Sequence, residues 1–530
     1  MDSDTSNSGT SPQPGVGRRI RDLVGGGGAG GERSDRLTVL SGTGPNIVGL
    51  GVSVAATFAT NILISRGFGS SGAAVLGVVT LATQFAFIAG AATRFGMDMA
   101  AVRLVAIEVG RGEPGRTPAI VGRAAAVAAV VSAIGAGLVL LWSGQLADAF
   151  GEGTVSVFRA AALALPFVAL CQVYLGGTRG LKIMRHTLFI YWAGQPVAWI
   201  LLIGVTWSIH RSAASTVMAY ALSWILATVA AWYAWHRETG TLVRVPGEPA
   251  LVGALVRYGA PRAPAALLSQ MLFWADYFVA SRYIAATELG VYAAAVRVAQ
   301  ALMLLLVAVN YMFSPFVADL HARGERDRLD DLYKSLTRWM MAGTIPLLVV
   351  LLIAPEAILQ LFGSRFETGS AALRILLIGQ VVNVGVGSVG FILIMVGRTG
   401  WDLAVYAASF ALDLAVAFVL APRLGMEGAA VAQAATMVFS NAARLYLVWR
   451  FVRIQPFSSD YARLAIPAVI ASGGAFVAHL LCRNAGWPVD LVATGAAGVV
   501  AYAVALVGTG FGLAPSERAL IRRLLPLRSA

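Results

Sequence analysis

The sequence predicts an all-α polytopic membrane protein with about 14 transmembrane helices. The chain has 530 residues, of which 58% are hydrophobic and only 13% are charged, whereas soluble globular domains carry about 25% charged residues. Apolar stretches of roughly 20 residues, which is the length that crosses a bilayer core, recur between residues 46 and 511. This composition excludes a soluble globular protein.

Charged residues, Pro and Gly mark the breaks between the apolar segments. The polar stretch 236–258 divides the first twelve spans into two groups of six, so we expect two pseudo-symmetric lobes followed by two extra helices. The predicted spans are 46–65, 73–93, 119–142, 156–175, 187–207, 213–235, 259–281, 289–316, 338–362, 370–396, 402–421, 428–449, 464–482 and 489–511.

The same breaks predict the domain organisation. The N-terminal segment is rich in Gly, Ser, Asp and Arg, which is typical of a flexible tail. The predicted parts are a disordered cytoplasmic tail (1–43), an N-lobe (44–235), a cytoplasmic linker (236–258), a C-lobe (259–450), the extra spans (451–511) and a cytoplasmic C-terminal tail (512–530).

The distribution of positive charge predicts the orientation. With the N-terminus in the cytoplasm, the inside loops and tails hold roughly 27 Lys and Arg residues and the outside loops roughly 6, as the positive-inside rule requires. We therefore expect a multi-pass protein of the cell (inner or plasma) membrane with both termini in the cytoplasm. The formal net charge of +13 is spread over short loops, so it indicates membrane topology and no nucleic-acid partner.

The two predicted lobes share a pattern in their first hairpins. The first hairpin reads "ILISRGFGSSGAAVLGVVTLATQ" (62–84) and the hairpin of the seventh and eighth spans ends "YFVASRYIAATELGVYAAAVRVAQ" (277–300). Both carry Ser-Arg at the end of a span, a short turn, then Leu-Gly-Val and a helix that reaches Gln. Paired halves of this kind are common in transporters.

Two charges lie inside the predicted seventh and eighth spans. At 1.5 Å per residue, Asp276 and Arg297 both lie roughly 7 Å above the bilayer centre on neighbouring helices. A charge at that depth costs about 3 kcal/mol or more, so it faces protein or water and not lipid. Two interpretations stay open at this point. The pair is either an internal salt bridge between two helices or part of a substrate-binding cavity.

Other polar residues within the spans are weaker candidates for the cavity. Thr57 and Asn61 belong to a polar stripe on the first span, which is explained either by helix packing or by cavity lining. Arg66 and Arg374 lie near outer span ends, where snorkelling to the interface competes with a role in the cavity. Asp413 lies near the middle of its span and is a candidate coupling or structural group.

No catalytic residue, metal site or cofactor is expected. Cys171 and Cys482 lie far apart within predicted spans and have no metal-ligand spacing. The run "GVGSVG" (385–390) matches a dinucleotide fingerprint in letters only, because these glycines lie inside the tenth span, where they allow close helix approach or a bend. The outside loops are too short for an extracytoplasmic catalytic domain.

Several segments resemble those of a known family. They are "ELGVYAAAVRVAQ" (288–300), "ILQLFGSRFETGSAALRIL" (358–376), "LAPRLGMEGAAVAQAATMV" (420–438), "RFGMDMAAVRLVA" (94–106) and "PFVADLHARGERDRLDDLY" (315–333). Together, and in the order in which they follow one another along the chain, they resemble the Wzx-type flippases of polysaccharide or lipid-linked oligosaccharide, within the multidrug/oligosaccharidyl-lipid/polysaccharide exporter superfamily. One departure is Asp413, where the family more often has Asn.

The resemblance implies a fold and a function. It implies two six-helix lobes that enclose a cavity, and transport of a polyprenyl-pyrophosphate-linked glycan from the cytoplasmic to the outer leaflet. The implied partners are the lipid-linked glycan, membrane lipids and the polysaccharide polymerase or glycosyltransferase machinery. Arg297 would suit a pyrophosphate because guanidinium binds phosphate oxygens in a bidentate manner. The alternatives are a lipid II flippase, a cation-coupled multidrug exporter and, from another class, a membrane glycosyltransferase or ligase.

Overall fold

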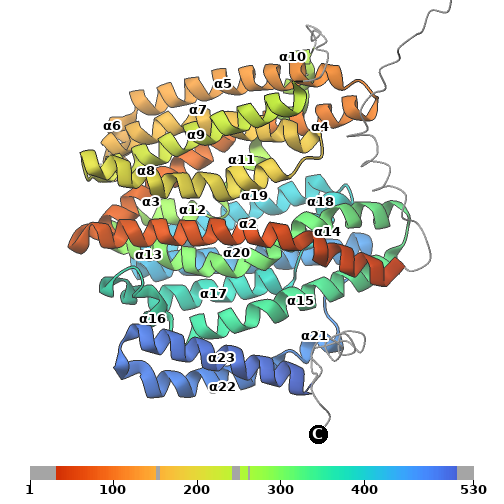
Figure 1. Ribbon diagram of the computed structural model, residues 1–530. Coiled ribbons are helices and arrows are strands. Elements are labelled where there is room, and N and C mark those ends of the chain that lie inside the picture. Colours follow the sequence, from red (N-terminus) through yellow and green to blue (C-terminus); the bar gives the residue numbers. More distant parts are fainter. Residues whose placement is uncertain (1–30, 151–154, 241–250, 261–262, 510–530) are drawn as a thin grey trace, which may run out of the picture.

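The computed structural model describes residues 31–150, 155–240, 251–260 and 263–509, and all regular elements within these ranges are helices (Figure 1). The long helices run roughly parallel, as expected when each one crosses the same bilayer. Eleven of the described helices are long and apolar enough to span a membrane. The all-α polytopic class is therefore confirmed. Three further predicted spans coincide with α2, the broken pair α11 and α12, and α20, so the count of fourteen stays a prediction.

The N-lobe is built around α7, which packs against α3, α4, α5 and α9. Its buried face is rich in alanine, and small side chains let membrane helices approach closely. The lobe contains α2 (Gly31–Gly67), α3 (Gly72–Thr93), α4 (Met97–Gly110), α5 (Thr117–Leu141), α6 (Ser143–Phe150), α7 (Val155–Gly180), a π-helical segment η3 (Thr187–Gly194), α8 (Gln195–Ile209) and α9 (Ala213–Thr239), with short 3₁₀ turns η1 (Gly69–Ser71) and η2 (Pro114–Arg116).

The C-lobe follows the short helix α10 (Leu251–Gly259). It contains α11 (Ala263–Met271), α12 (Ala275–Ala280), α13 (Ala286–Gln300), η5 (Ala301–Met303), α14 (Leu304–Ala322), α15 (Arg326–Ile353), α16 (Pro355–Leu359), η6 (Ser364–Gly369), α17 (Ser370–Gly385), α18 (Val389–Met395), α19 (Thr399–Leu424) and α20 (Met426–Val452).

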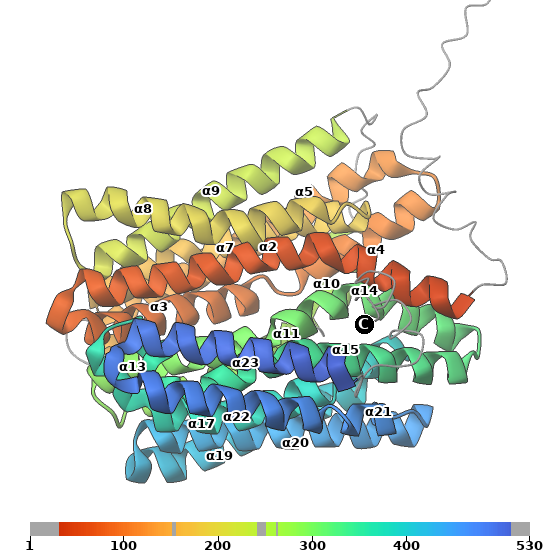
Figure 2. The same ribbon diagram turned by 60° about the horizontal axis from the view of Figure 1, so that its bottom comes forward.

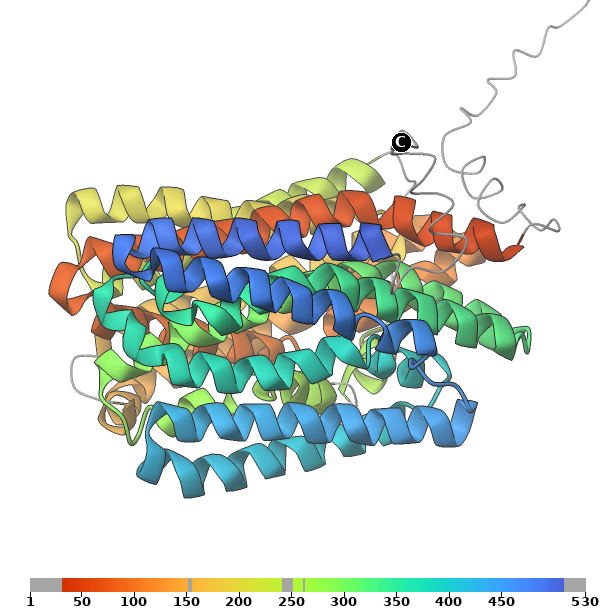
Figure 3. The same cartoon turned by 90° about the horizontal axis from the view of Figure 1, so that it is seen from below.

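The last two long helices form a hairpin at the periphery. After α21 (Ser459–Ala462), α22 (Ala465–Cys482) and α23 (Trp487–Thr509) pack against each other, and both contact α15 of the C-lobe. The turn η7 (Arg483–Ala485) joins them. Figure 3 shows this dark-blue pair lying over the surface of the bundle.

Some of the predicted boundaries can be compared with the helices. Helix α2 begins at Gly31, so residues 31–43 of the predicted tail are helical. The predicted linker 236–258 contains the end of α9 and most of α10, while residues 241–250 lie outside the described part of the chain. The predicted C-terminal tail, 512–530, also lies outside it.

Two predicted spans are broken within the membrane. The seventh is interrupted between α11 and α12, and the tenth is interrupted between α17 and α18. In the tenth, Gly387 has a φ of +68°, a conformation that glycine adopts without strain. Gly387 therefore provides a bend, which is one of the two roles that the sequence left open for the glycines of "GVGSVG".

The two lobes meet through glycines of α3 and α13. A Cβ added at Gly290 would overlap the backbone carbonyl oxygen of Ala73, and one added at Gly77 would lie 2.5 Å from the carbonyl oxygen of Ala286. The buried hydroxyl of Tyr277 donates to the Gly77 carbonyl oxygen at 2.9 Å. The lobes are thus held in backbone contact at the end of the molecule that carries the α2–α3 and α12–α13 turns.

Gly290→Ala is expected to lower the free energy of unfolding by about 1–3 kcal/mol, because the added methyl group overpacks this contact. Thermal unfolding of the purified protein in detergent measures the change. The matched control is Gly137→Ala, since a Cβ at Gly137 of α5 would meet nothing within 4 Å. Equal melting temperatures for the two variants would contradict the backbone contact.

Candidate functional site

The site is built on the break in the predicted seventh span. Residues 272–274 interrupt the helix, and Trp274 has φ −143° and ψ −3°, outside the helical region. Non-helical backbone at membrane depth needs partners from the protein or from water. Gln433 of α20 supplies one, because its side-chain amide donates to the carbonyl oxygen of Phe273 at 3.1 Å.

Asp276 follows this break, in the first turn of α12. Its side chain is completely buried. The hydroxyl of Tyr292, from α13, donates to the Oδ2 atom, while Oδ1 has no hydrogen-bond partner. A carboxylate near the N-terminus of a helix is favoured by the free backbone N–H groups there, but these do not neutralise its charge.

A second buried carboxylate, Asp413 of α19, faces Asp276. It is also completely buried. Its Oδ1 atom accepts from the Thr436 hydroxyl at 3.3 Å, and its Oδ2 atom has no partner. The two carboxyl groups lie within electrostatic range of each other. Neither forms an ion pair with a Lys or Arg side chain in the described ranges.

A pair of this kind cannot carry two negative charges at low dielectric. Like-charged carboxylates that share a buried site keep at least one neutralising proton, or take up a cation. The arrangement can therefore hold and release a small positive charge inside the membrane. The sequence named Asp276 and Asp413 separately, and the structure brings them together.

Of the two interpretations of Asp276 and Arg297, the internal salt bridge is not present among the described residues. The guanidinium of Arg297 stacks over the Trp274 ring, with 4.7 Å between its Cζ atom and the ring centroid, and it donates to the side chain of Gln300 at 3.3 Å. The salt-bridge interpretation assumed a continuous helix of 1.5 Å per residue, whereas the helix is interrupted at 272–274, just before Asp276.

Arg297 instead lies where the lobes meet. Its electrostatic neighbours include Tyr277 of the C-lobe and Tyr220 of α9 in the N-lobe. Its buried Nε atom has no hydrogen-bond partner, and no acidic side chain of the described residues pairs with it. This guanidinium therefore has hydrogen-bonding capacity available for an anionic ligand.

The two outer arginines named from the sequence both contact protein groups. Arg66, at the end of α2, donates to the carbonyl oxygens of Leu361 at 2.7 Å and Gln360 at 2.9 Å, so it links the N-lobe to the C-lobe. It also lies 5.8 Å from the ring of Trp487 in α23. Arg66 thus connects the two lobes at the end of the molecule that faces outwards in the predicted orientation.

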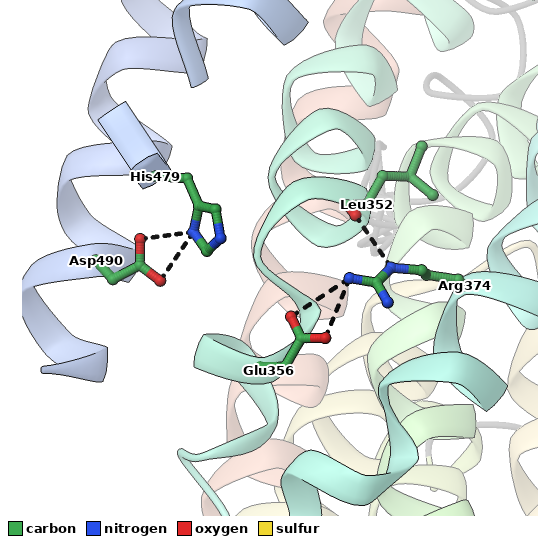
Figure 4. A network of polar contacts seen from close by, with 5 residues as sticks. All are labelled: Leu352, Glu356, Arg374, His479 and Asp490. Carbon is green, nitrogen blue, oxygen red and sulfur yellow. Dashed lines mark hydrogen bonds and ion pairs between the residues drawn. The ribbon is translucent and has the colours of Figure 1, made fainter. Parts of the chain in front are cut away.

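Arg374 belongs to a separate network at the same end. Its guanidinium donates to Glu356 at 3.1 Å and to the Leu352 carbonyl at 3.5 Å (Figure 4). The same figure shows His479 of α22 bonded to Asp490 of α23, at 2.9 Å. These contacts connect the ends of neighbouring helices and give Arg374 an acidic partner.

The polar stripe on α2 includes a contact between two of the residues named from the sequence. The amide of Asn61 donates to the backbone carbonyl of Thr57 at 2.8 Å, which is a contact within one helix. Sequence reasoning also missed Tyr292, Thr436 and Trp274. Of these three, only Tyr292 could have been suggested by the sequence, because it belongs to the same predicted hairpin as Asp276.

Comparison with known proteins gives one match to a family profile. The family is described as "Polysaccharide biosynthesis protein", and it matches residues 74–371. Among characterised relatives, the probable low-salt glycan biosynthesis flippase Agl15 of Haloferax volcanii is 24% identical over 204 residues. The match spans 38% of this chain and 43% of that relative, which is less than half of its length.

Solved structures with the same architecture cover more of the chain. The lipid II flippase MurJ, in an inward closed conformation, superposes with a TM-score of 0.70 at 14% identity, over 90% of this chain and 99% of that one. An inward-facing multidrug resistance MATE family transporter of the MOP superfamily gives 0.65 at 14% identity, over 79% and 98%. At these identities the likeness concerns the fold.

Tyr292→Phe is expected to lower the free energy of unfolding by about 1–3 kcal/mol, because it leaves a buried carboxyl oxygen without its donor. In an Asp276→Asn background the same change has a smaller effect, which a double-mutant cycle of thermal unfolding measures. Tyr446→Phe is the control, since Tyr446 is 60% exposed. Additive effects of the two changes would argue against the contact.

Proposed function

We propose that this chain, which belongs to the polysaccharide biosynthesis protein family, moves a polyprenyl-pyrophosphate-linked oligosaccharide from the cytoplasmic to the outer leaflet. The family profile covers more than half of the chain. The curated relative is a probable glycan flippase, and the fold is that of membrane transporters. In this proposal the chain acts as a carrier and not as an enzyme. In this proposal its partners are the lipid-linked glycan, the surrounding lipids and the polysaccharide polymerase or glycosyltransferase machinery.

The observation that carries the proposal is the position of Arg297. A guanidinium between the lobes, stacked on Trp274 and without an acidic partner in the described part of the chain, suits a diphosphate. Its planar fork binds phosphate oxygens in a bidentate manner and stays charged at all physiological pH values. In this proposal Arg297 holds the pyrophosphate while the glycan lies between the lobes.

Transport proceeds by alternating access of two bodies, the N-lobe (44–235) and the C-lobe (259–450). Both termini lie in the cytoplasm in this proposal, so the α3–α13 contact and the Arg66 link close the outer side. Arg66 must release the carbonyl groups of Gln360 and Leu361 when that side opens. Rocking of two lobes about a central site is a common transport movement.

The buried carboxyl pair supplies the coupling. Binding and release of a small cation by Asp276 and Asp413 changes the charge of the C-lobe core, between α12, α19 and α20. Burying two carboxylates without a neutralising cation costs free energy at low dielectric. The neutral and charged forms of the pair therefore favour different packing of these helices. The pair thereby links the movement of the lobes to an ion gradient.

A cation-coupled multidrug exporter is the second candidate. The fold and the acidic pair favour it. Both carboxyl groups, however, are completely buried and so are out of reach of a drug, and the charged group at the lobe boundary is a cation. A cationic drug would be repelled by Arg297, whereas a lipid diphosphate is attracted.

Arg297→Gln is expected to reduce glycan export by at least about tenfold, because charge-assisted hydrogen bonds to phosphate are lost. The measurements are the exported glycan and the lipid-linked precursor that accumulates in the cytoplasmic leaflet. Arg282→Gln is the control, since Arg282 is exposed in the outer turn. Normal glycan export by a stably inserted Arg297→Gln variant would contradict the assignment of Arg297 as the pyrophosphate-binding residue.

Asp413→Asn is expected to uncouple transport from the ion gradient, because an amide neither needs nor releases a neutralising cation. Transport of the lipid-linked glycan in proteoliposomes, with and without a gradient, measures this. The variant should equilibrate substrate but should not respond to the gradient. Asp319→Asn, at an exposed residue on α14, serves as control. An unchanged gradient response in Asp413→Asn contradicts the role.

A further inference from the structure

Helices α19 and α20 enclose a buried polar seam. The two helices lie side by side (Figure 2) and make extensive contact. Polar residues recur on α19 and α20 every three or four positions, so each set lies on one helix face. The seam consists of Asp402, Tyr406, Ser409 and Asp413 from α19, and Thr436, Ser440 and Arg444 from α20.

One end of the seam is the Asp276–Asp413 pair, and the other end is an ion pair. Arg444 donates to Asp402 at 2.9 Å, and both side chains are more than nine-tenths buried. Arg444 also donates to the Ser440 hydroxyl and lies 4.4 Å from the Tyr406 ring centroid. Asp402 is in the first turn of α19, near the surface that is cytoplasmic in the proposed orientation.

Polar atoms along the whole seam are buried without a hydrogen-bond partner. They are Oδ1 of Asp276, Oδ2 of Asp413, Oγ of Ser409 and Nη2 of Arg444. Buried polar atoms in proteins almost always have a partner, and each orphan costs about 1–3 kcal/mol. Buried water that bridges about three polar groups is the usual solution, and this seam offers polar atoms on both walls.

The opposite side of the carboxyl pair is apolar. Beyond Asp413, towards the other end of α19, Val279, Ala417 and Ala432 form a buried cluster, with Leu414 and Val416 packed against it. The next turn continues with Ala421, which is also buried. The described side chains of this cluster offer a water chain no hydrogen-bond partner.

We propose that water fills this seam and connects the Asp276–Asp413 pair with the cytoplasmic side alone, so that the pair exchanges protons with the cytoplasm in the state described. The proposal deepens the proposed function, because it names the coupling ion and its direction. A proton from hydronium binds a carboxyl oxygen of the pair and leaves a water molecule behind, so one positive charge moves and no bond of the protein breaks.

The seam suits protons. The hydroxyls of Ser409, Ser440 and Thr436 each donate and accept hydrogen bonds, which is what proton hopping needs. Around the pair itself, the titratable groups are Tyr292 of α13 and Tyr277 of α12. Arg297, the cation on α13, is stacked on Trp274 instead.

The first test is cysteine accessibility in a chain whose Cys171 and Cys482 are replaced by Ala. Ser409→Cys is treated with a membrane-impermeant methanethiosulfonate in inside-out and right-side-out vesicles. Matched controls are Ala417→Cys, in the apolar cluster, and Ala408→Cys, which is exposed on the lipid side of α19. Only a hydrated thiol ionises and reacts, so Ser409→Cys should react at least about tenfold faster than both controls, and only in inside-out vesicles.

A Ser409→Cys thiol as unreactive as that of Ala417→Cys would overturn the proposal, because it would show a dry seam. Reaction at equal rates in both kinds of vesicle, or only in right-side-out vesicles, would overturn the claim of cytoplasmic access. Neither result depends on glycan transport. The flippase proposal is judged separately by export in the Arg297→Gln variant, so the two failures can be told apart.

The second test identifies the ion. Infrared difference spectra of the reconstituted protein follow the protonated carboxyl band that Asp413→Asn removes. A pH drop on the cytoplasmic side should build up this band, and Ser409→Ala should slow the build-up by at least about tenfold, since it removes one hydroxyl from the path. Replacing K⁺ by Na⁺ at constant pH should leave the band unchanged. Loss of the band in Na⁺ would show that the pair takes a metal cation and would overturn the assignment to protons.

Discussion

The interruption of the helix at 272–274 is the constraint on which the arrangement of charges depends. Backbone groups released within the bilayer cannot bond to lipid, so a neighbouring helix has to supply partners. Gln433 of α20 does so for the carbonyl of Phe273. This contact draws α20 and its partner α19 against α12, and the same contact brings Asp413 to Asp276. A requirement of the main chain thereby creates the acidic pair.

The break also separates the two charges of the hairpin. Asp276 turns into the C-lobe, where Tyr292 donates to it. Arg297, on the neighbouring helix α13, stacks on Trp274 beside the boundary with the N-lobe. Had the charges paired, each would have neutralised the other within one lobe. Their separation yields an acidic group that needs a small cation and a basic group that can receive an anion, as the proposed function requires.

The packing of the C-lobe and of the interface between the lobes differs between the two sides of the membrane. At the outer end in the proposed orientation, glycines bring the backbones of α3 and α13 together and Arg66 binds carbonyl groups across the lobes. Alanines and valine pack beyond Asp413 on that side. Towards the other end, a polar seam runs to Arg444 and Asp402. Close packing excludes water on one side and buried hydrogen-bonding groups retain it on the other.

The sequence by itself determined the fold class, the approximate helix limits and the family, because hydrophobic length and short motifs are local properties of the chain. It also identified Asp276, Arg297 and Asp413 as unusual, since charge within an apolar segment is visible without coordinates. Only the tertiary structure decided which of them meet. The break at 272–274 is not marked by proline or glycine, and Asp413 reaches Asp276 through packing between distant segments. Pairing of buried charges depends on where helices bend and which helices touch, and neither follows from the spacing of residues along one span.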